Sequence, residues 1–372
     1  MERPMSNTNV NTHFWVDRSD YAQTHIKTTE LPQALSDGQV LLKVDRFAFT
    51  ANNITYAAVG DMIGYWKFFP AEEGLGTIPV WGFADVVDSN CEGVEVGERF
   101  YGYYPMSSYL LAEPGKIGKQ SFTDVMAHRL ELPIIYNQYI RCSSDPSYKQ
   151  EAEALQMVLR PLFTTSFLLD DFFADENFFG ANTVVLTSAS SKTALGMAFL
   201  LKNNREGREQ DYKIVGLTSE HNKAFVEGLG CYDQVLTYDQ LSQLDASQPT
   251  ASVDFAGNGQ LLADLHRHLG EQLKYSCLVG VSHWDQRGGM SEDVPGPQPQ
   301  MFFAPSQAEK RLGDWGAEGF QQRLHTQWVG FTGFVSDWMD IEENAGQAAV
   351  ESIYQKMLSG DVNPSKGYIL SL

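Results

Sequence analysis

An apolar strand, a turn of small polar residues and an apolar helix follow one another without a break over residues 184–202. The turn and first helical residues read Ser-Ala-Ser-Ser-Lys-Thr-Ala from Ser188 to Ala194. A buried strand that leads directly into a helix is typical of a βαβ unit, in which the next strand of the sheet runs parallel to the first. This stretch therefore predicts a parallel sheet covered by helices.

The same alternation continues through the middle of the chain. The pattern predicts strands at 183–187, 213–217, 234–236, 252–255 and 275–281, and helices at about 192–203, 220–229 and 259–269. A leucine- and phenylalanine-rich helical run, interrupted by Pro161, comes before them at 150–173. Alternating strands and helices indicate a Rossmann-like, doubly wound parallel sheet, which we place at 151–300.

The first third of the chain has a different texture. Short strands are predicted at 39–48, 78–87, 97–104 and 109–111, separated by Gly, Pro and Asp turns, which indicates a β domain at 1–150. In the last part, 301–372, a helix is predicted at about 345–359 and a strand at 368–370. We expect this segment to return to the β domain, so the predicted fold class is α/β with two domains.

Composition limits the classes of function. A chain of 372 residues with 43% hydrophobic residues is long enough for two cores. The net charge of −20 repels phosphate, so nucleic acid and anionic membranes are not expected partners. No signal segment and no run of ~18 apolar residues is present, which favours a soluble cytoplasmic protein. Four widely spaced cysteines predict neither a disulfide framework nor a structural zinc site.

The order of these segments resembles a known superfamily. The segments 40–44, 80–87 and 94–102, followed by 184–202, 215–219 and 253–254, are similar to those of the medium-chain dehydrogenase/reductase superfamily. The similarity is greatest to its zinc-independent quinone oxidoreductase and enoyl reductase branch, with this chain in an outlying family. The resemblance covers most of residues 30–285 and implies a GroES-like β-barrel domain followed by a Rossmann-like domain.

The resemblance also bears on metals. Zinc-dependent members have a catalytic Cys where this chain has Thr50, and a His-Glu pair where it has Trp81 and Gly82. None of these three side chains is a zinc ligand, so we predict no metal.

In the resembling reductases the turn at 188–194 holds the pyrophosphate of NADP(H) against the start of a helix. Ser188, Lys192 and Ala194 occupy slots that are glycine there, and the other positions stay small. In one interpretation Lys192 pairs with a phosphate while Ser188, Ser190, Ser191 and Thr193 provide space and hydroxyl donors. In the other the helix has lost its nucleotide role and Lys192 is a solvated first-turn residue.

The end of the second predicted strand, Thr218-Ser219, is followed by Lys223 one turn later. The resemblance implies that Ser219, Lys223 and Tyr238 contact a 2′-phosphate, which favours NADP over NAD. Ser219 is equally suited to cap the following helix, and Glu220 either caps it or binds a ribose.

The resemblance places substrate chemistry in the β domain. Tyr56 or Tyr65 is the expected proton donor and Asn53, with Asn52, positions the nicotinamide or substrate. Packing is the alternative role for each of these tyrosines. Nearby aromatic residues suggest an apolar cleft between the domains: Trp66, Phe68, Phe69, Trp81, Phe83, Phe302 and Phe303. His283 follows a strand expected near the nicotinamide, and we assign it no role.

These observations predict an NADPH-dependent, zinc-independent oxidoreductase that reduces an activated C=C or quinone-like carbonyl of a hydrophobic substrate. Two alternatives remain. One is a binding or regulatory protein that keeps the fold without turnover, and the other is a lyase-type enzyme that uses the same cleft. A homodimer is expected, with the strand around 275–281 as its sheet edge.

Overall fold

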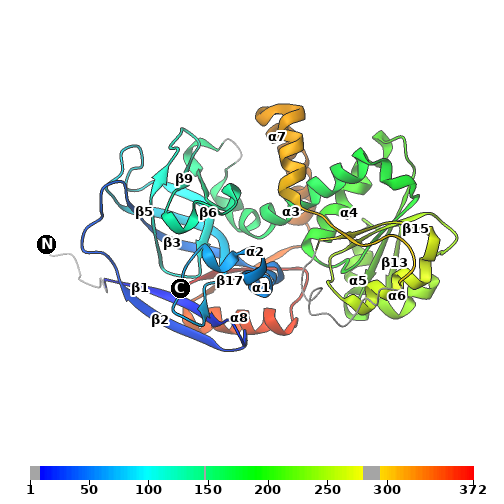
Figure 1. Cartoon of the computed structure of the whole chain (residues 1–372), viewed down its shortest axis with the longest axis horizontal. Helices are drawn as coiled ribbons and strands as arrows, with labels where there is room; N and C mark the ends of the chain where they lie inside the picture. Colours follow the sequence, from blue (N-terminus) through cyan, green and yellow to red (C-terminus); the bar gives the residue numbers. More distant parts are fainter. Residues whose placement is uncertain (1–8, 146–147, 280–293) are drawn as a thin grey trace. The chain divides into compact units, whose positions relative to one another are not determined.

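The computed structural model describes residues 9–145, 148–279 and 294–372. The chain divides into two compact units, of which the first comprises residues 1–158 and 340–372 and the second residues 159–339. Figure 1 shows the labelled helices and strands of both units.

The first unit is built on two sheets. A three-stranded sheet has the order β2-β1-β4. A nine-stranded sheet has the order β17-β18-β3-β5-β6-β10-β9-β8, and β7 pairs with β3 outside this path. The strands are β1 (Val10–Asp17), β2 (Thr24–Glu30), β3 (Val40–Phe49), β4 (Leu75–Gly76), β5 (Pro79–Ser89), β6 (Arg99–Pro105), β7 (Tyr109–Ala112), β8 (Pro114–Gly115), β9 (Ser121–Asp124), β10 (Gln138–Arg141), β17 (Asp340–Ala345) and β18 (Lys366–Ser371).

The end of the chain completes this unit. The predicted strand at 368–370 lies in β18, which pairs antiparallel with β3 and sets Tyr368 opposite Phe49. Helix α8 (Gln347–Ser359) precedes it, and its Tyr354 contacts the rings of Phe14 and Phe49. The expected return of the chain to the β domain is therefore made by β17, α8 and β18.

Short helices connect the strands of the first unit. They are α1 (Ala51–Ala58), α2 (Gly60–Ile63), η1 (Tyr65–Lys67), η2 (Ala127–Arg129), η3 (Ile134–Tyr136), η4 (Cys142–Ser144) and η5 (Gln150–Ala152). Between α1 and β5 the indole of Trp66 lies against the backbone of Gly60 and Gly76, where a Cβ atom would come within 2.2 and 2.5 Å of the ring. Neither glycine can therefore carry a side chain without displacing the indole.

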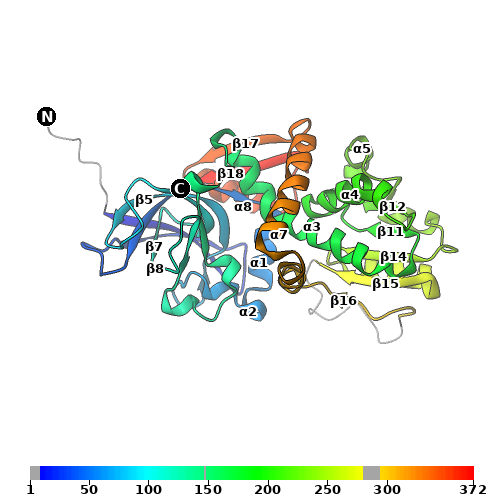
Figure 2. The same ribbon diagram turned by 90° about the horizontal axis from the view of Figure 1, so that it is seen from above.

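The second unit contains a six-stranded sheet of order β13-β12-β11-β14-β15-β16, and every strand pair in it is parallel. The strands are β11 (Thr183–Leu186), β12 (Lys213–Thr218), β13 (Gln234–Thr237), β14 (Thr250–Asp254), β15 (Leu273–Leu278) and β16 (Gln300–Met301). Figure 2 shows β12, β11, β14 and β15 in this order. The strand order reverses direction between β11 and β14, which is the switch point of a doubly wound sheet. The predicted α/β fold class is confirmed.

Helices α4 (Lys192–Asn204), α5 (Glu220–Gly228) and α6 (Gly259–Leu269) connect these strands, with η7 (Arg205–Gly207), η8 (Tyr238–Gln243) and η9 (Gly270–Gln272). Leu265 and Leu269 of α6 pack against Val185, Val215 and Leu217 of the sheet in one buried cluster. This packing fixes the sheet, whose carboxyl ends carry the loops described below.

Two long helices differ from the sequence prediction. Helix α3 (Glu153–Asp175) continues through Pro161, where we predicted an interruption. The short helix η6 (Asn177–Gly180) follows α3. Helix α7 (Ala304–Ser336) was not predicted. Its Phe331 stacks on Phe163 of α3 with ring centroids 4.6 Å apart.

The domain boundaries differ accordingly. We placed the whole of 301–372 with the β domain and the first boundary at 150, whereas residues 301–339 belong to the second unit and the first unit extends to Val158. The glycines at 313, 316, 319, 330 and 333 obscure the helical pattern of α7. Packing of α7 against α3 and α4 compensates for this weak propensity.

The edge of strand β15, which we expected to form the dimer, is partly paired with another strand of the same chain. At the carboxyl end of β15, Cys277 and Leu278 pair with Gln300 and Met301 of β16. Residues 280 and 281 of the predicted strand lie outside the described residues. Among the helices of the described ranges, none combines the length and apolar character needed to cross a membrane.

Candidate functional site

The turn between β11 and α4 has a defined backbone structure. Ser188 adopts a left-handed conformation with φ of 47°, and its carbonyl accepts a hydrogen bond from Ser191 N at 2.8 Å. Ser191 is the N-cap of α4, where its Oγ accepts from Ala194 N at 3.3 Å. Because serine pays a steric cost for a positive φ that glycine avoids, Ser188 keeps the glycine-like geometry of the turn.

A neighbouring glycine makes room for this turn. A Cβ atom on Gly216 of β12 would lie 2.9 Å from both Ala189 Cβ and the ring of Tyr232. Ala189 N donates to Leu217 O at 3.0 Å, and the Tyr232 hydroxyl donates to Ala189 O at 2.9 Å. The turn is therefore held against β12 on both sides of Ala189.

Lys192 is the first residue of α4 and is half-buried. Burial lowers the pKa of Lys192 to about 8. A lysine in the first turn of a helix is opposed by the helix dipole, whereas a phosphate at that position is favoured by both the dipole and the lysine. Thr193, next along the helix, is half-buried and its carbonyl accepts a hydrogen bond from Ser166 Oγ of α3 at 2.7 Å.

The loop after β12 is tied to the turn. Asn222 Nδ2 of α5 donates to Ser190 Oγ at 3.0 Å. Tyr238 begins η8, which follows β13, and burial raises the pKa of Tyr238. Because β11, β12 and β13 are parallel neighbours, the loops that carry Ser188, Ser190 and Tyr238 follow strands that end at one edge of the sheet.

Ser219 and Lys223 follow β12. Ser219 occupies the N-cap position of α5, but its side chain makes no capping hydrogen bond. Lys223 Nζ donates to Gln240 Oε1 at 3.1 Å. Ser219 therefore takes the expected N-cap position, which is compatible with a ligand contact, and its hydroxyl does not cap the helix.

A pair of residues at the switch point was missed by the sequence prediction. Thr187 Oγ1, just after β11, donates to Asp254 Oδ1 at 2.5 Å, and Asp254 also accepts from the backbone N–H groups of Ala256 and Gly257. Burial raises the pKa of Asp254. The pair joins the carboxyl ends of β11 and β14. An aspartate at the end of a strand was visible in the sequence, but its partner 67 residues away was not.

In the first unit, Asn53 is engaged in local structure. Its Oδ1 accepts from Thr50 N and Oγ1 at 2.8 and 3.1 Å, and its Nδ2 donates to Pro79 O at 2.9 Å. Asn53 therefore holds the start of α1 to β5, which is the structural alternative to its predicted catalytic role.

Tyr56 and Tyr65 lie in a cluster of tyrosines with Tyr103 and Tyr136, which we call the tyrosine cluster. Trp81 Nε1 donates to the Tyr56 hydroxyl at 3.4 Å, and the hydroxyls of Tyr65 and Tyr136 are 3.1 Å apart. Burial raises the pKa of both Tyr56 and Tyr65. A tyrosine is neutral near pH 7 and can donate a hydrogen bond, and the raised pKa makes each of these hydroxyls a weaker acid than an exposed tyrosine. Tyr136, 71 residues from Tyr65, was missed by the sequence prediction.

The remaining aromatic residues of the predicted cleft are distributed between the units. Trp66, Phe68, Phe69 and Phe83 are buried in the first unit, and Phe302 of the second contacts Phe172 with ring centroids 5.4 Å apart. The apolar cleft stays a prediction. His283 lies outside the described residues.

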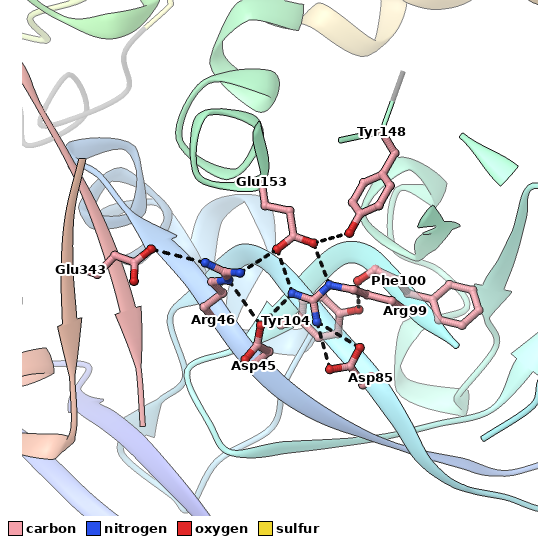
Figure 3. Close-up of polar contacts among 9 residues, drawn as sticks. All are labelled: Asp45, Arg46, Asp85, Arg99, Phe100, Tyr104, Tyr148, Glu153 and Glu343. Atoms are coloured by element: carbon pink, nitrogen blue, oxygen red, sulfur yellow. Dashed lines mark hydrogen bonds and ion pairs between the residues drawn. The ribbon is translucent and has the colours of Figure 1, made fainter. Parts of the chain in front are cut away.

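An ionic cluster surrounds the buried Glu153 at the start of α3 (Figure 3). The Glu153 carboxylate is fully buried and contacts both Arg99 and Arg46. Arg99 also binds Asp45 and Asp85, and Arg46 reaches Glu343 of β17. Each carboxylate is paired with an arginine, so the cluster fixes the unit rather than offering ligands. In the described ranges, no three His, Cys, Asp or Glu side chains are grouped as a metal site.

Several solved structures are similar to this chain in fold. A putative NADPH:quinone reductase from Mesorhizobium loti matches with a TM-score of 0.59 and 13% identity, covering 98% of this chain and 99% of that one. CurA from Vibrio vulnificus in complex with NADPH matches at 0.57 and 13%, with 93% of each chain covered. The quinone oxidoreductase from Coxiella burnetii matches at 0.52 and 12%, over 98% and 99%.

At these identities the likeness establishes the fold alone. No curated protein matches the chain. The model of a family described as protein of unknown function, DUF2855, matches residues 47–363. This range runs from β3 of the first unit, through the whole parallel sheet, to the end of α8 and beyond, so the chain belongs to the DUF2855 family.

Proposed function

We propose that this protein is an NADPH-dependent oxidoreductase that reduces an activated C=C or a quinone-like carbonyl of a hydrophobic substrate without zinc. The observation that carries the proposal is at the carboxyl edge of the parallel sheet. There a tight turn precedes the start of α4, and the neighbouring strand is followed by Ser219, whose hydroxyl makes no capping bond, and by Lys223. The solved structures of similar fold include one in complex with NADPH.

The residues of this edge fit a dinucleotide. The start of α4 directs a positive dipole end at a pyrophosphate, and Lys192 adds a charge-assisted contact. Ser219 and Lys223 suit a 2′-phosphate, and Tyr238 follows the neighbouring strand β13. Small side chains at 188–191 let a ligand approach the backbone.

NADPH, when bound, supplies a hydride to the electrophilic carbon of the substrate. We assign the proton donor to the Tyr65–Tyr136 pair. One of the two hydroxyl protons forms the hydrogen bond between Tyr65 and Tyr136. The proton of the other hydroxyl is then available to a substrate oxygen. Tyr56, whose oxygen accepts from Trp81, keeps its own proton in the same way.

The test is a titration of the purified protein with NADPH, followed by protein and nicotinamide fluorescence. We expect micromolar binding, weaker binding of NADH, and oxidation of NADPH with a quinone, an enone or an enoyl thioester. Absence of NADPH binding would overturn the proposal.

A binding protein without turnover is the second candidate. It is favoured by Asn53, whose side-chain atoms are engaged in internal hydrogen bonds, and by the burial of Tyr56. NADPH binding with no oxidation on any of these substrates would support it. We also propose a homodimer, which a molar mass of twice 41.6 kDa in light scattering would support.

A further inference from the structure

The contact between Lys223 and Gln240 joins two loops of the second unit. Lys223 lies in the first turn of α5, after β12, and Gln240 lies in η8, after β13. Gln240 Oε1 accepts from Lys223 Nζ at 3.1 Å and from the backbone N–H of Thr237 at 3.2 Å. One neutral oxygen therefore holds the lysine and is itself held by the main chain.

The neutrality of this oxygen matters for the charge of the site. A carboxylate at position 240 would form an ion pair with Lys223 and cancel its positive charge. The amide orders the lysine while leaving the charge for a ligand. Two exposed carboxylates, Glu220 and Asp239, are near in sequence. The pKa of Asp239 is lowered mainly by hydrogen bonds, first that of Thr237, and to a smaller extent by the charge of Lys223.

The surrounding loops are already connected. Strands β11, β12 and β13 are parallel neighbours, so their carboxyl ends lie at one edge of the sheet. Asn222 of α5 is hydrogen-bonded to Ser190 in the turn before α4. Lys223 is thus fixed in a set of loops that are joined before a ligand arrives, which reduces the entropy lost when it binds an anion.

We propose that Gln240 is a positioning residue that makes this site select a 2′-phosphate: its amide oxygen holds the Lys223 ammonium on the helix that Ser219 begins. This inference rests on the proposed function. It assigns the preference for NADPH over NADH to a residue that makes no contact with the phosphate itself.

The experiment compares Gln240→Glu and Gln240→Ala with the unsubstituted protein. Gln243→Glu is the matched control, because Gln243 ends the same 3-10 helix, is exposed and undergoes the same charge change. Calorimetry measures the dissociation constants of NADPH and NADH, and of adenosine 2′,5′-bisphosphate and 5′-AMP as probes without the nicotinamide. The readout is the ratio within each pair, because general damage to the fold weakens both members.

We expect Gln240→Glu to reduce the preference for the 2′-phosphorylated ligand by about 10- to 100-fold, as for loss of one charge-assisted contact. Gln240→Ala removes the tether to Lys223 and the bond to the Thr237 N–H without adding a charge, and it should reduce the preference by about 3- to 10-fold. Gln243→Glu should leave both ratios unchanged.

If the unsubstituted protein prefers NADPH and both Gln240 variants keep that preference, the positioning role of Gln240 is overturned while the proposed function stands. An equal loss in Gln243→Glu would also overturn it, because the effect would then be a general one of charge. If the unsubstituted protein binds neither dinucleotide, the proposed function fails, and this inference with it.

Discussion

Glu153 and Arg99 form a two-point ion pair inside the first unit, with Arg99 Nε 2.7 Å from Glu153 Oε1 and Arg99 Nη2 2.8 Å from Glu153 Oε2. The Tyr148 hydroxyl donates to the same Oε1 at 2.7 Å. Glu153 is the first residue of α3, so its carboxylate also lies at the favourable, N-terminal end of the helix dipole. The pair connects the beginning of this helix to strand β6 (Figure 3).

Replacement of Glu153 by Gln should destabilise the first unit. Removing one partner of a buried ion pair typically costs about 3–5 kcal/mol, and we expect the lower end because Arg99 keeps Asp45 and Asp85. Urea unfolding measures the change. Glu151→Gln, two residues earlier and exposed, is the control and should change the free energy of unfolding by less than about 0.5 kcal/mol. Equal effects of the two substitutions would contradict a role for the buried pair.

Binding of NADPH should weaken at alkaline pH because of Lys192. Its pKa is lowered to about 8, so the ammonium is present at pH 7 and largely lost at pH 9. If the charged form makes the phosphate contact, the dissociation constant should rise by up to about tenfold between these pH values. Lys192→Met should bind more weakly at pH 7, by the equivalent of about 1.5–3 kcal/mol, and show a flat profile. If NADPH binding by the unsubstituted protein is equally independent of pH, Lys192 makes no phosphate contact and is a solvated helix residue.

Substitutions in the tyrosine cluster should separate turnover from binding. Tyr65→Phe and Tyr136→Phe remove the hydroxyl pair, and loss of a proton donor lowers turnover by about 10²- to 10⁴-fold. The affinity for NADPH should not change, because each substitution removes one hydroxyl and leaves the residues assigned to the dinucleotide unchanged. Tyr109→Phe, in β7, is the control. Full turnover in both variants would show that the pair is structural.

Gly216→Ala should disturb the turn that follows β11. The new methyl group would lie 2.9 Å from Ala189 Cβ and from Tyr232, and overpacking of this kind costs about 1–3 kcal/mol. We expect a lower melting temperature together with weaker NADPH binding. Gly228→Ala, where no atom lies within 4 Å of the new Cβ, is the control and should be neutral or slightly stabilising. Unchanged NADPH affinity in Gly216→Ala would separate the turn from the dinucleotide site.

Local sequence patterns were sufficient to predict the strands and helices whose apolar residues recur regularly. The strands and helices from Thr183 to Leu278 follow the predicted order, because each strand is a short apolar run and each helix begins after a small polar residue. Helix α7 escaped prediction because its glycines weaken the pattern and its stability comes from aromatic contacts with α3 and α4.

Partners that are distant in the sequence could not be predicted. The hydroxyl pair of Tyr65 and Tyr136 and the bond between Thr187 and Asp254 join residues 71 and 67 positions apart. The contact of Lys223 with Gln240 depends on α5 and η8 following neighbouring parallel strands.

The sequence by itself determined the two-part α/β fold, the position of the turn at 188–194 and the charged and hydroxyl residues around it, since periodicity and turn chemistry are local properties. Only the tertiary structure decided which of these groups are engaged. Asn53 forms local hydrogen bonds, the Ser219 hydroxyl does not cap its helix, and Lys223 donates to a neutral amide oxygen. The physical reason is that a side chain's hydrogen-bond partners, burial and pKa depend on neighbours brought together by strand pairing and helix packing.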